Sequence, residues 1–95
     1  MSVDAVAELQ AWIRCIVSGL VTVPQSVRVE QVGVTGPTML FALYLDERDL
    51  GRVIGRRGLV VQSLRSLVTV AGHRRGLQVR LEVPQARSGR RAGGL

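Results

Sequence analysis

The sequence predicts an α+β fold in which one face of a three-stranded sheet is covered by three helices, in the order helix, strand, strand, helix, helix, strand. Three observations lead to this fold class. Two long segments repeat apolar residues at helical spacing, shorter segments alternate or are continuously apolar, and glycines separate two of the predicted helices. With 95 residues, 46% of them hydrophobic, the chain is long enough for one domain with one core.

The first predicted element is a helix from Val3 to about Gly19. Its expected buried stripe consists of Val6, Leu9, Ile13, Ile16, Val17 and Leu20. Trp12 lies at the margin of this stripe, and Cys15 falls on roughly the opposite side, so we assign no role to the thiol. Pro24 then prevents the helix from continuing.

Two strands follow the first helix. Residues 26–32 begin with Val27 and Val29 alternating with polar side chains, which is typical of a half-buried strand. Residues 33–37 have the composition of a turn, and residues 39–45 form a second apolar run of strand length. We therefore expect a hairpin with a loop of several residues.

The second strand is apolar at both alternating sets of positions, unlike the first. One interpretation, which we favour, is a central strand packed on both sides or carrying partly exposed apolar residues. The other is that its outward face forms a dimer surface. The sequence does not separate the two.

Asp46 is placed to cap a short helix that runs to about Ile54, with Asp49 adding negative charge to the first turn. A longer helix follows, which Gly72 or Gly76 helps to end. Its expected buried side consists of Val60, Leu64, Leu67, Val68 and Ala71.

The last predicted strand alternates apolar and polar residues from Leu77 to Val83 and is closed by Pro84. Residues 85–95 are rich in Arg, Gly and Ala without periodicity, and we interpret them as a basic disordered tail after a domain at 1–84. The arginines of this tail are Arg87, Arg90 and Arg91. They could attract nucleic acid or increase solubility, and the sequence favours neither role over the other.

The segment 51–58 reads Gly-Arg-Val-Ile-Gly-Arg-Arg-Gly and lies between the short helix and the long one. Gly55 and Gly58 enclose Arg56 and Arg57 at a helix start. Glycine has no Cβ, so the backbone can approach an anion closely, and the helix start favours negative charge. The segment therefore predicts a binding site for nucleic-acid phosphate. A purely structural turn is the other interpretation, but arginines lining such a turn would repel each other.

Composition supports a polyanionic partner. The formal net charge is +6, and every cationic side chain is arginine, because the sequence has no lysine. Cys15 is the single cysteine and His73 the single histidine, so the sequence predicts no disulfide, no metal site and no cofactor. No signal peptide and no apolar run of membrane-spanning length is visible, and we expect a soluble cytoplasmic protein.

Enzymatic activity is not expected. The segment 51–58 lacks the spacing and the hydroxyl residue of a nucleotide-hydrolysing P-loop. Cys15 and His73 fall in different predicted elements, which leaves no recognisable nucleophile and base.

The string Ile54-Gly55-Arg56-Arg57-Gly58, between two helices after a strand, resembles the I-G-x-x-G loop of KH domains. The element order is similar to that of type II KH domains. The fuller string 49–58 and the ending 79–83 resemble the small bacterial single-KH proteins of the KhpA (YlqC) family, over about residues 3–84. Family members often have a basic residue after the second loop glycine, where this chain has Leu59.

The resemblance implies an RNA-binding protein, an RNA chaperone or post-transcriptional regulator, whose loop clamps a single-stranded backbone while a neighbouring groove reads bases. The implied RNA-binding residues are Arg52, Ile54, Gly55, Arg56, Arg57, Gly58 and Val60. Ile54, with Val60 or Val61 and a second-strand residue such as Leu43, would form the groove floor. RNA and single-stranded DNA are not separated by the sequence.

The resemblance also implies partners: a second copy of the chain or a larger multidomain KH protein. The alternative function is therefore an interaction module that forms homodimers or heterodimers through the second strand or first helix, with little RNA contact. For Arg74, Arg75 and His73 we favour a solvated helix end stabilised by the helix dipole.

Overall fold

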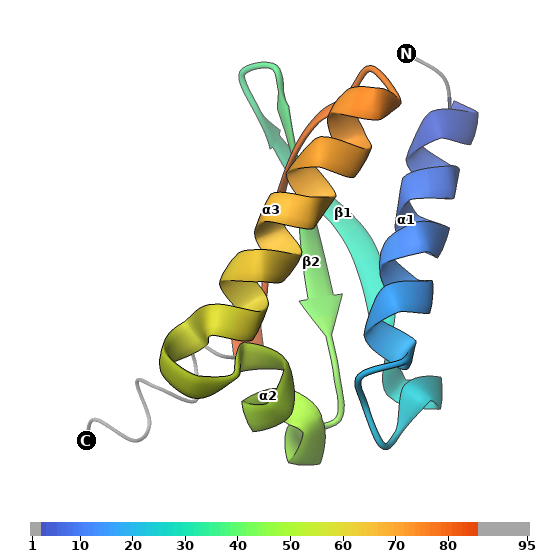
Figure 1. Ribbon diagram of the computed structural model, residues 1–95. Coiled ribbons are helices and arrows are strands. Elements are labelled where there is room, and N and C mark those ends of the chain that lie inside the picture. The colour runs from blue at the N-terminus through green and yellow to red at the C-terminus, as the bar shows by residue number, and fades with distance from the viewer. Residues whose placement is uncertain (1–2, 86–95) are drawn as a thin grey trace.

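The computed structural model describes residues 3–85. The elements appear in the predicted order, with short 3-10 turns η1 and η2 before the first strand and before the last helix (Figure 1). Their bounds are α1 Val3–Ser18, η1 Pro24–Ser26, β1 Arg28–Thr35, β2 Thr38–Tyr44, α2 Glu47–Ile54, η2 Arg56–Gly58, α3 Leu59–Arg74 and β3 Gln78–Glu82. The predicted α+β class and the element order are confirmed.

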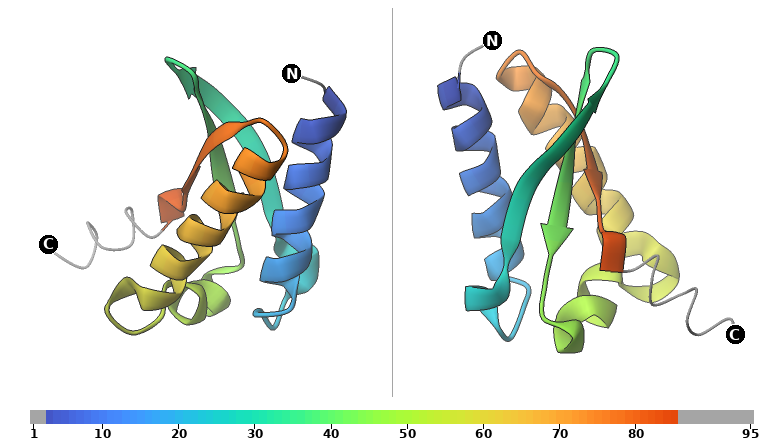
Figure 2. Two further views of the ribbon diagram at one scale, coloured as in Figure 1. Left: turned by 45° about the horizontal axis from the view of Figure 1, so that its top comes forward. Right: turned by 180° about the vertical axis from the view of Figure 1, so that it is seen from behind.

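The sheet has the strand order β1-β2-β3, so β2 is the central strand. It pairs antiparallel with β1 and parallel with β3, which α2 and α3 connect to it by a crossover. Figures 1 and 2 show α1 and α3 side by side across one face of the sheet, with α2 beyond one end of it. The opposite face of the sheet carries no helix in the described part of the chain.

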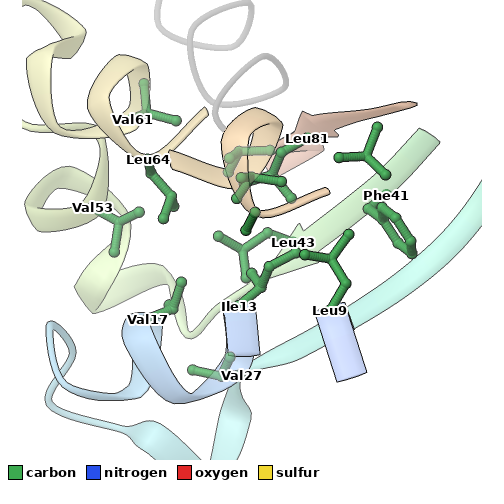
Figure 3. Packing of buried hydrophobic residues seen from close by; sticks show 14 of the residues in the cluster. Leu9, Ile13, Val17, Val27, Phe41, Leu43, Val53, Val61, Leu64 and Leu81 are labelled. Atoms are coloured by element: carbon green, nitrogen blue, oxygen red, sulfur yellow. The ribbon is translucent and has the colours of Figure 1, made fainter. Parts of the chain in front are cut away.

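The core consists of aliphatic side chains together with Phe41 and Met39. Its side chains come from all three helices, from β2 and β3, and from Val27 just before β1, and they point toward one centre (Figure 3). Val29 of β1 packs against them and is partly buried. The largest fully buried members are Phe41, Leu9, Ile13, Leu43, Leu77, Leu81, Val17, Val27, Val53 and Val68. Val53 is the contribution of α2, so the helix that leads into the glycine loop is anchored in the same core.

Two residues assigned to buried stripes are exposed instead. Leu20 is 39% exposed because α1 ends at Ser18 and Leu20 no longer follows its spacing. Leu67 is 52% exposed, since the buried stripe of α3 lies along other positions. Those positions are Val61, Leu64, Val68, Ala71 and Gly72.

The hairpin is tighter than the sequence predicts. β1 continues to Thr35, so the turn consists of Gly36 and Pro37 and not of the whole range 33–37. Gly36 has a φ of 59°, which suits glycine in a two-residue turn. A β-bulge between Gln31 and Gly33 shifts the register and leaves one residue of β1 without a partner on β2. That extra residue interrupts the alternation by which the strand was recognised.

The outward side of β2 is largely covered by the neighbouring strands. Ala42 is only 1% exposed and pairs in register with Glu30 on one side and Glu82 on the other. The Arg28 guanidinium lies 4.9 Å from the centre of the Tyr44 ring. These contacts favour a central strand with partly covered apolar residues over a dimer surface on β2.

The end of α3 and its passage into β3 depend on two glycines. Gly76, with a φ of 74°, is the left-handed residue after the helix, and the Leu77 amide donates to the Gly72 carbonyl at 2.8 Å. Gly72 itself lies against β3, because a Cβ there would be 2.7 Å from Val79 Cγ2. Gly76 therefore ends the helix, while Gly72 lets α3 approach the sheet.

The described fold extends one residue past the predicted boundary at Pro84. The Gln85 side-chain amide donates to the Leu45 carbonyl at 2.8 Å, and its oxygen accepts from the Leu45 amide at 2.7 Å. The rest of the predicted tail, 86–95, lies outside the described residues, together with its three arginines.

Asp49, which was predicted to add negative charge to the first turn of α2, is a buried residue there. It is 1% exposed, and its carboxylate accepts from the Thr22 amide at 2.8 Å, the Thr22 hydroxyl at 2.7 Å and the Val23 amide at 3.0 Å. The carboxylate thus ties the segment after α1 to α2. Asp46 caps the same helix as predicted, accepting from the Arg48 amide at 3.0 Å.

Burial alone would raise the pKa of Asp49, but the hydrogen bonds from Thr22 and Val23 together lower this pKa below its ordinary value of 3.8. A carboxyl whose pKa is lower in the folded state stabilises the fold above its ordinary pKa, and loses that contribution as the pH falls through the folded value. The stabilisation by Asp49 is therefore present at neutral pH and disappears in strong acid.

We expect Asp49→Asn to lower the melting temperature at pH 7 by several degrees, because an amide NH₂ would face backbone donors that the carboxylate now satisfies. The measurement is thermal unfolding by circular dichroism between pH 2 and pH 7. The gap between wild type and variant should close toward acid pH. An equal gap at every pH would contradict the assigned role of the charge.

Candidate nucleic-acid interface

The loop between α2 and α3 has an unusual backbone. Gly55, Arg57 and Gly58 have φ values of 76°, 57° and 74°, so three of the four residues in 55–58 adopt positive φ. The Gly58 amide donates to the Gly55 carbonyl at 3.1 Å, which closes the turn. The loop is therefore a defined structure between two helices (Figure 1).

Gly55 is required by packing as well as by conformation. A Cβ on Gly55 would lie 2.4 Å from Val60 Cγ2 and 2.8 Å from Val60 Cβ, far inside contact distance. A Cβ on Gly58 would meet only Val61 Cγ1 at 4.0 Å, so Gly58 is favoured by its φ alone. Packing and backbone conformation thus both require glycine at position 55, whereas backbone conformation alone favours glycine at position 58.

Arg57 is the only residue other than glycine with positive φ in the described part of the chain. A left-handed conformation costs an L-residue about 1–2 kcal/mol. Strained backbone of this kind is concentrated at functional sites, where the surrounding structure enforces it. The side chain of Arg57 is exposed, so the conformation serves no burial of its own.

The first turn of α3 also favours an anion. Gly58 occupies the N-cap position and offers no side-chain cap, in contrast to Asp46 at the start of α2. The amide of Leu59 donates to the carbonyl of Arg56 in the preceding 3-10 turn, and the amides of the first turn form the positive end of the helix dipole. Because the loop glycines have no side chains, a ligand can approach the start of α3 closely.

The arginines around the loop make no ion pair in the described range, although the charge of Arg52 helps to lower the pKa of Asp49. Within residues 3–85, the arginines in ion pairs are Arg28, Arg48, Arg75 and Arg80. Arg52, Arg56 and Arg57 are exposed and make no such pair there. The helix-free face of the sheet, by contrast, carries the pairs Arg28–Glu30 and Arg80–Glu82, so its charges largely cancel.

A groove of about 510 Å³ begins at the loop and runs along α3 toward the end of β3. It is lined by Ile54, Gly55, Arg57, Gly58, Val61, Gln62, Arg65 and Val83. No acidic side chain is among them. The groove therefore combines apolar walls with a basic rim next to the loop.

The structure brings most of the predicted site residues together. Ile54, Gly55, Arg57 and Gly58 line the groove. Arg56 lies in the loop, and Arg52 lies one turn before it in α2.

Two proposed floor residues lie elsewhere. Val60 lines a separate apolar depression between α1 and α3, because it points away from the groove side occupied by Val61. Leu43 is fully buried in the core and contributes nothing to the surface.

Sequence reasoning missed Gln62, Arg65 and Val83 as parts of the groove. A usable signal was present for the first two. Gly58, Val61 or Gln62, and Arg65 recur at helical spacing, which places them on one side of α3 below the loop. Val83 comes from the far end of the chain, and local spacing cannot predict its position.

The end of α3 agrees only partly with the solvated helix end predicted for it. His73 and Arg74 are exposed. Arg75 is half-buried and connects two helices, because its Nε lies 3.5 Å from Glu8 Oε1 and its NH1 donates to the Ala71 carbonyl at 3.0 Å. Arg75 is therefore a structural residue, and Cys15, as expected, is exposed.

Residues 3–85 contain no group of three or more His, Cys, Asp or Glu side chains arranged to hold a metal ion. Among the helices in this range, none is both long enough and apolar enough to cross a membrane.

Comparison with known proteins identifies the family. The model of the "KhpA/KhpB, KH domain" family matches residues 10–83, which include the loop and the whole groove. The chain belongs to the KhpA/KhpB KH-domain family. The KH resemblance predicted from the loop is thereby confirmed.

Two proteins named "RNA-binding protein KhpA" illustrate the relationship. That of Listeria monocytogenes is 31% identical over 75 residues, which cover 79% of this chain and 97% of the relative. That of Chlamydia pneumoniae is 28% identical over 75 residues, which cover 79% of this chain and 95% of the relative. No solved structure matches this KhpA/KhpB-family chain significantly.

We expect Gly55→Ala to destabilise the fold by about 3 kcal/mol, because it combines strained φ with overlap on Val60. Gly51→Ala is the matched control: Gly51 lies in α2, and a Cβ added there would have nothing within 4 Å, so alanine should be neutral or slightly stabilising. Denaturant unfolding measures both. Equal stability of the two variants would contradict the packing constraint at Gly55.

Proposed function

We propose that the chain is a single-stranded RNA-binding protein that holds the RNA backbone at the loop 55–58. The observation that carries the proposal is the loop itself: a glycine-lined backbone at a helix start without a side-chain cap, beside Arg56 and Arg57, which make no ion pair in the described range. The relatives named as RNA-binding proteins support the choice of RNA as the anion.

The mechanism follows from the geometry of the loop. Phosphate oxygens would accept from backbone amides at the start of α3, where Gly55 and Gly58 leave room for them. Arg56 and Arg57 add charge at the same place, and Arg52 extends the basic edge along α2. Gly58, Gly55 and these three arginines form the proposed phosphate clamp.

The groove provides room for the bases that project from the clamped backbone. Ile54, with the small exposed parts of Val61 and Val83, gives it apolar surface, which suits the flat faces of unstacked bases. Val60 is left out of this proposed surface, because it lines the depression on the other side of α3.

The proposed role is binding and not catalysis, as an RNA chaperone or post-transcriptional regulator in the cytoplasm. A single KH surface grips few nucleotides. Useful selectivity would then come from a second copy, a partner protein or a structured RNA that presents several contacts at once.

We expect Arg56→Asp/Arg57→Asp to abolish binding of a fluorescent single-stranded RNA pool. Arg14→Asp/Arg74→Asp is the matched control, because it changes the net charge equally at two exposed arginines away from the loop. Wild type should bind with a logarithmic salt slope of about −2, as three phosphate contacts on a single strand would give. Circular dichroism establishes that both variants fold.

Two outcomes would contradict the clamp. If the loop variant and the control lose affinity equally, the binding reflects overall charge and not the loop. If folded wild type does not bind the RNA pool at all, the proposed function fails, and the alternative of a protein-interaction module takes its place.

That alternative is favoured by a separate apolar depression of about 350 Å³ between α1 and α3. It is lined by Ile16, Leu20, Leu59, Val60, Ser63, Leu64 and Leu67. Leu59, Leu67 and Val70 are 58%, 52% and 58% exposed, which is unusual for large apolar side chains on one helix. A second copy or another KH protein would dock here, on α3 and the end of α1. Of the two surfaces that the sequence suggested, this one includes the first helix and not β2.

We expect Leu67→Glu to prevent self-association, measured by analytical ultracentrifugation, if this surface pairs two copies. Thr69→Glu is the control, since Thr69 is exposed on the same helix about 200° away from Leu67. RNA binding at the loop should survive Leu67→Glu in the folded protein. A wild-type chain that stays monomeric at high concentration would exclude the homodimer.

A further inference from the structure

A second cleft, separate from the glycine loop, runs along the outer edge of β1. β1 is an edge strand, because β2 is the only strand that pairs with it in the described part of the chain. Figures 1 and 2 show α1 alongside this edge. The cleft between helix and strand has a volume of about 430 Å³. Its walls include Gln10, Ala11 and Arg14 on the helix side and Val27, Val29 and Glu30 on the strand side.

The main chain of β1 offers hydrogen-bonding groups to this cleft. The Gln10 side-chain amide donates to the Val29 carbonyl at 3.3 Å, so this carbonyl faces α1 and not β2. In an antiparallel pair, the main-chain groups of every second residue point away from the partner strand. Val29 and Gln31 therefore both present an amide and a carbonyl at the outer edge, before the bulge that follows Gln31.

The Gln10 side chain occupies the place that a main-chain amide of a further strand would take. A sheet is extended when the amides of an added chain donate to the carbonyls of its edge strand. The 3.3 Å hydrogen bond of Gln10 is longer than the usual range of about 2.7–3.2 Å. A main-chain amide at ordinary distance could replace it. Ala11 beside it carries only a Cβ, which leaves the cleft open.

One positive charge in the cleft has no ion pair among the described residues. Arg28 and Glu30 pair with each other at 3.4 Å, whereas Arg14 makes no ion pair within residues 3–85. Arg14 lies one helical turn after Gln10, toward the end of the cleft that Gln25 lines. At that end residues 19–27 join α1 to β1, which favours an extended ligand that stops there. The cleft thus suits a main chain with a negative charge at one end.

We propose that the edge of β1 binds the carboxyl-terminal segment of another protein as an added antiparallel strand, with its terminal carboxylate at Arg14. Antiparallel pairing brings the carboxyl end of the segment to the start of β1, beside Arg14. Main-chain hydrogen bonds to Val29 and Gln31 give affinity, and the carboxylate fixes the direction. This cleft shares no lining residue with the groove at the glycine loop, so the inference is independent of the proposed RNA binding.

The test starts from a synthetic library of random heptapeptides with a free carboxyl terminus, selected on the immobilised full-length protein. Enriched peptides are then titrated singly while amide chemical shifts are recorded by NMR. The shifts should concentrate at residues 10–14 and 28–31 and leave the loop 55–58 unchanged. A selection that enriches no peptide, or peptides that shift other residues, would overturn the proposal.

N-methylation of an enriched peptide tests for strand addition. Methyl groups on one alternating set of amides remove the donors that face β1, whereas methyl groups on the other set point to solvent. The first set should weaken binding by about tenfold or more, and the second by less than about twofold. Equal effects of the two sets would show that the peptide is not paired as a strand.

Arg14→Gln tests the carboxylate, with Arg74→Gln as the matched control at another exposed arginine. We expect Arg14→Gln to weaken binding of the free-carboxyl peptide by about fivefold or more, and Arg74→Gln to leave it unchanged. The same peptide with a carboxyl-terminal amide should bind wild type and Arg14→Gln equally. Circular dichroism establishes that both variants fold. Equal losses in the two variants would overturn the assignment of Arg14.

Two other occupants of the β1 edge would give different results. A second copy pairing through this edge would shift the amides of residues 28–31 as protein concentration rises, without peptide. A single-stranded RNA oligomer bound there would shift the same amides and compete with the peptide. Either result would overturn the proposal of a peptide site, while the loop 55–58 would be tested by its own variants.

Discussion

The buried carboxylate of Asp49 is the interaction on which the arrangement of the candidate site depends. It accepts three hydrogen bonds from Thr22 and Val23 and so joins the segment after α1 to α2. Val53 anchors the same helix in the core one turn later. Because α2 is fixed at both points, its C-terminal end places Gly55 at a defined position beside the start of α3. Of the three positive φ values in the loop only that of Arg57 is strained, and such a conformation persists where the surrounding structure enforces it.

Charge distribution then decides which surface of this small fold attracts an anion. Ion pairs engage Arg28 and Arg80 on the helix-free face of the sheet and Arg75 near the far end of α3, whereas Arg56 and Arg57 in the loop make no ion pair in the described part of the chain. The backbone adds the positive end of α3 at the same point. Loop conformation, helix start and unpaired arginine charge therefore coincide, although each alone would be weak evidence for a site.

Much of the fold could be predicted because its signals are local. Apolar spacing located α1 and α3, and the string 54–58 located the loop and its family. The errors have a different physical origin. The bulge in β1 hid the extent of the hairpin, and the exposure of Leu67 depends on how α3 is rotated against the sheet. The bonds of Asp49 to Thr22 and of Arg65 to Leu81 join residues 27 and 16 positions apart, which no local pattern encodes.

The proposed site for single-stranded RNA is the loop and the groove below it, and not the open sheet or the arginine charge as a whole. Amide chemical shifts recorded by NMR during titration with a short single-stranded RNA distinguish these possibilities residue by residue. The largest shifts should fall at residues 54–65 and 83, with little change on the helix-free face of β1 and β2. Shifts concentrated on that face, or spread evenly over all exposed arginines, would contradict the proposed site.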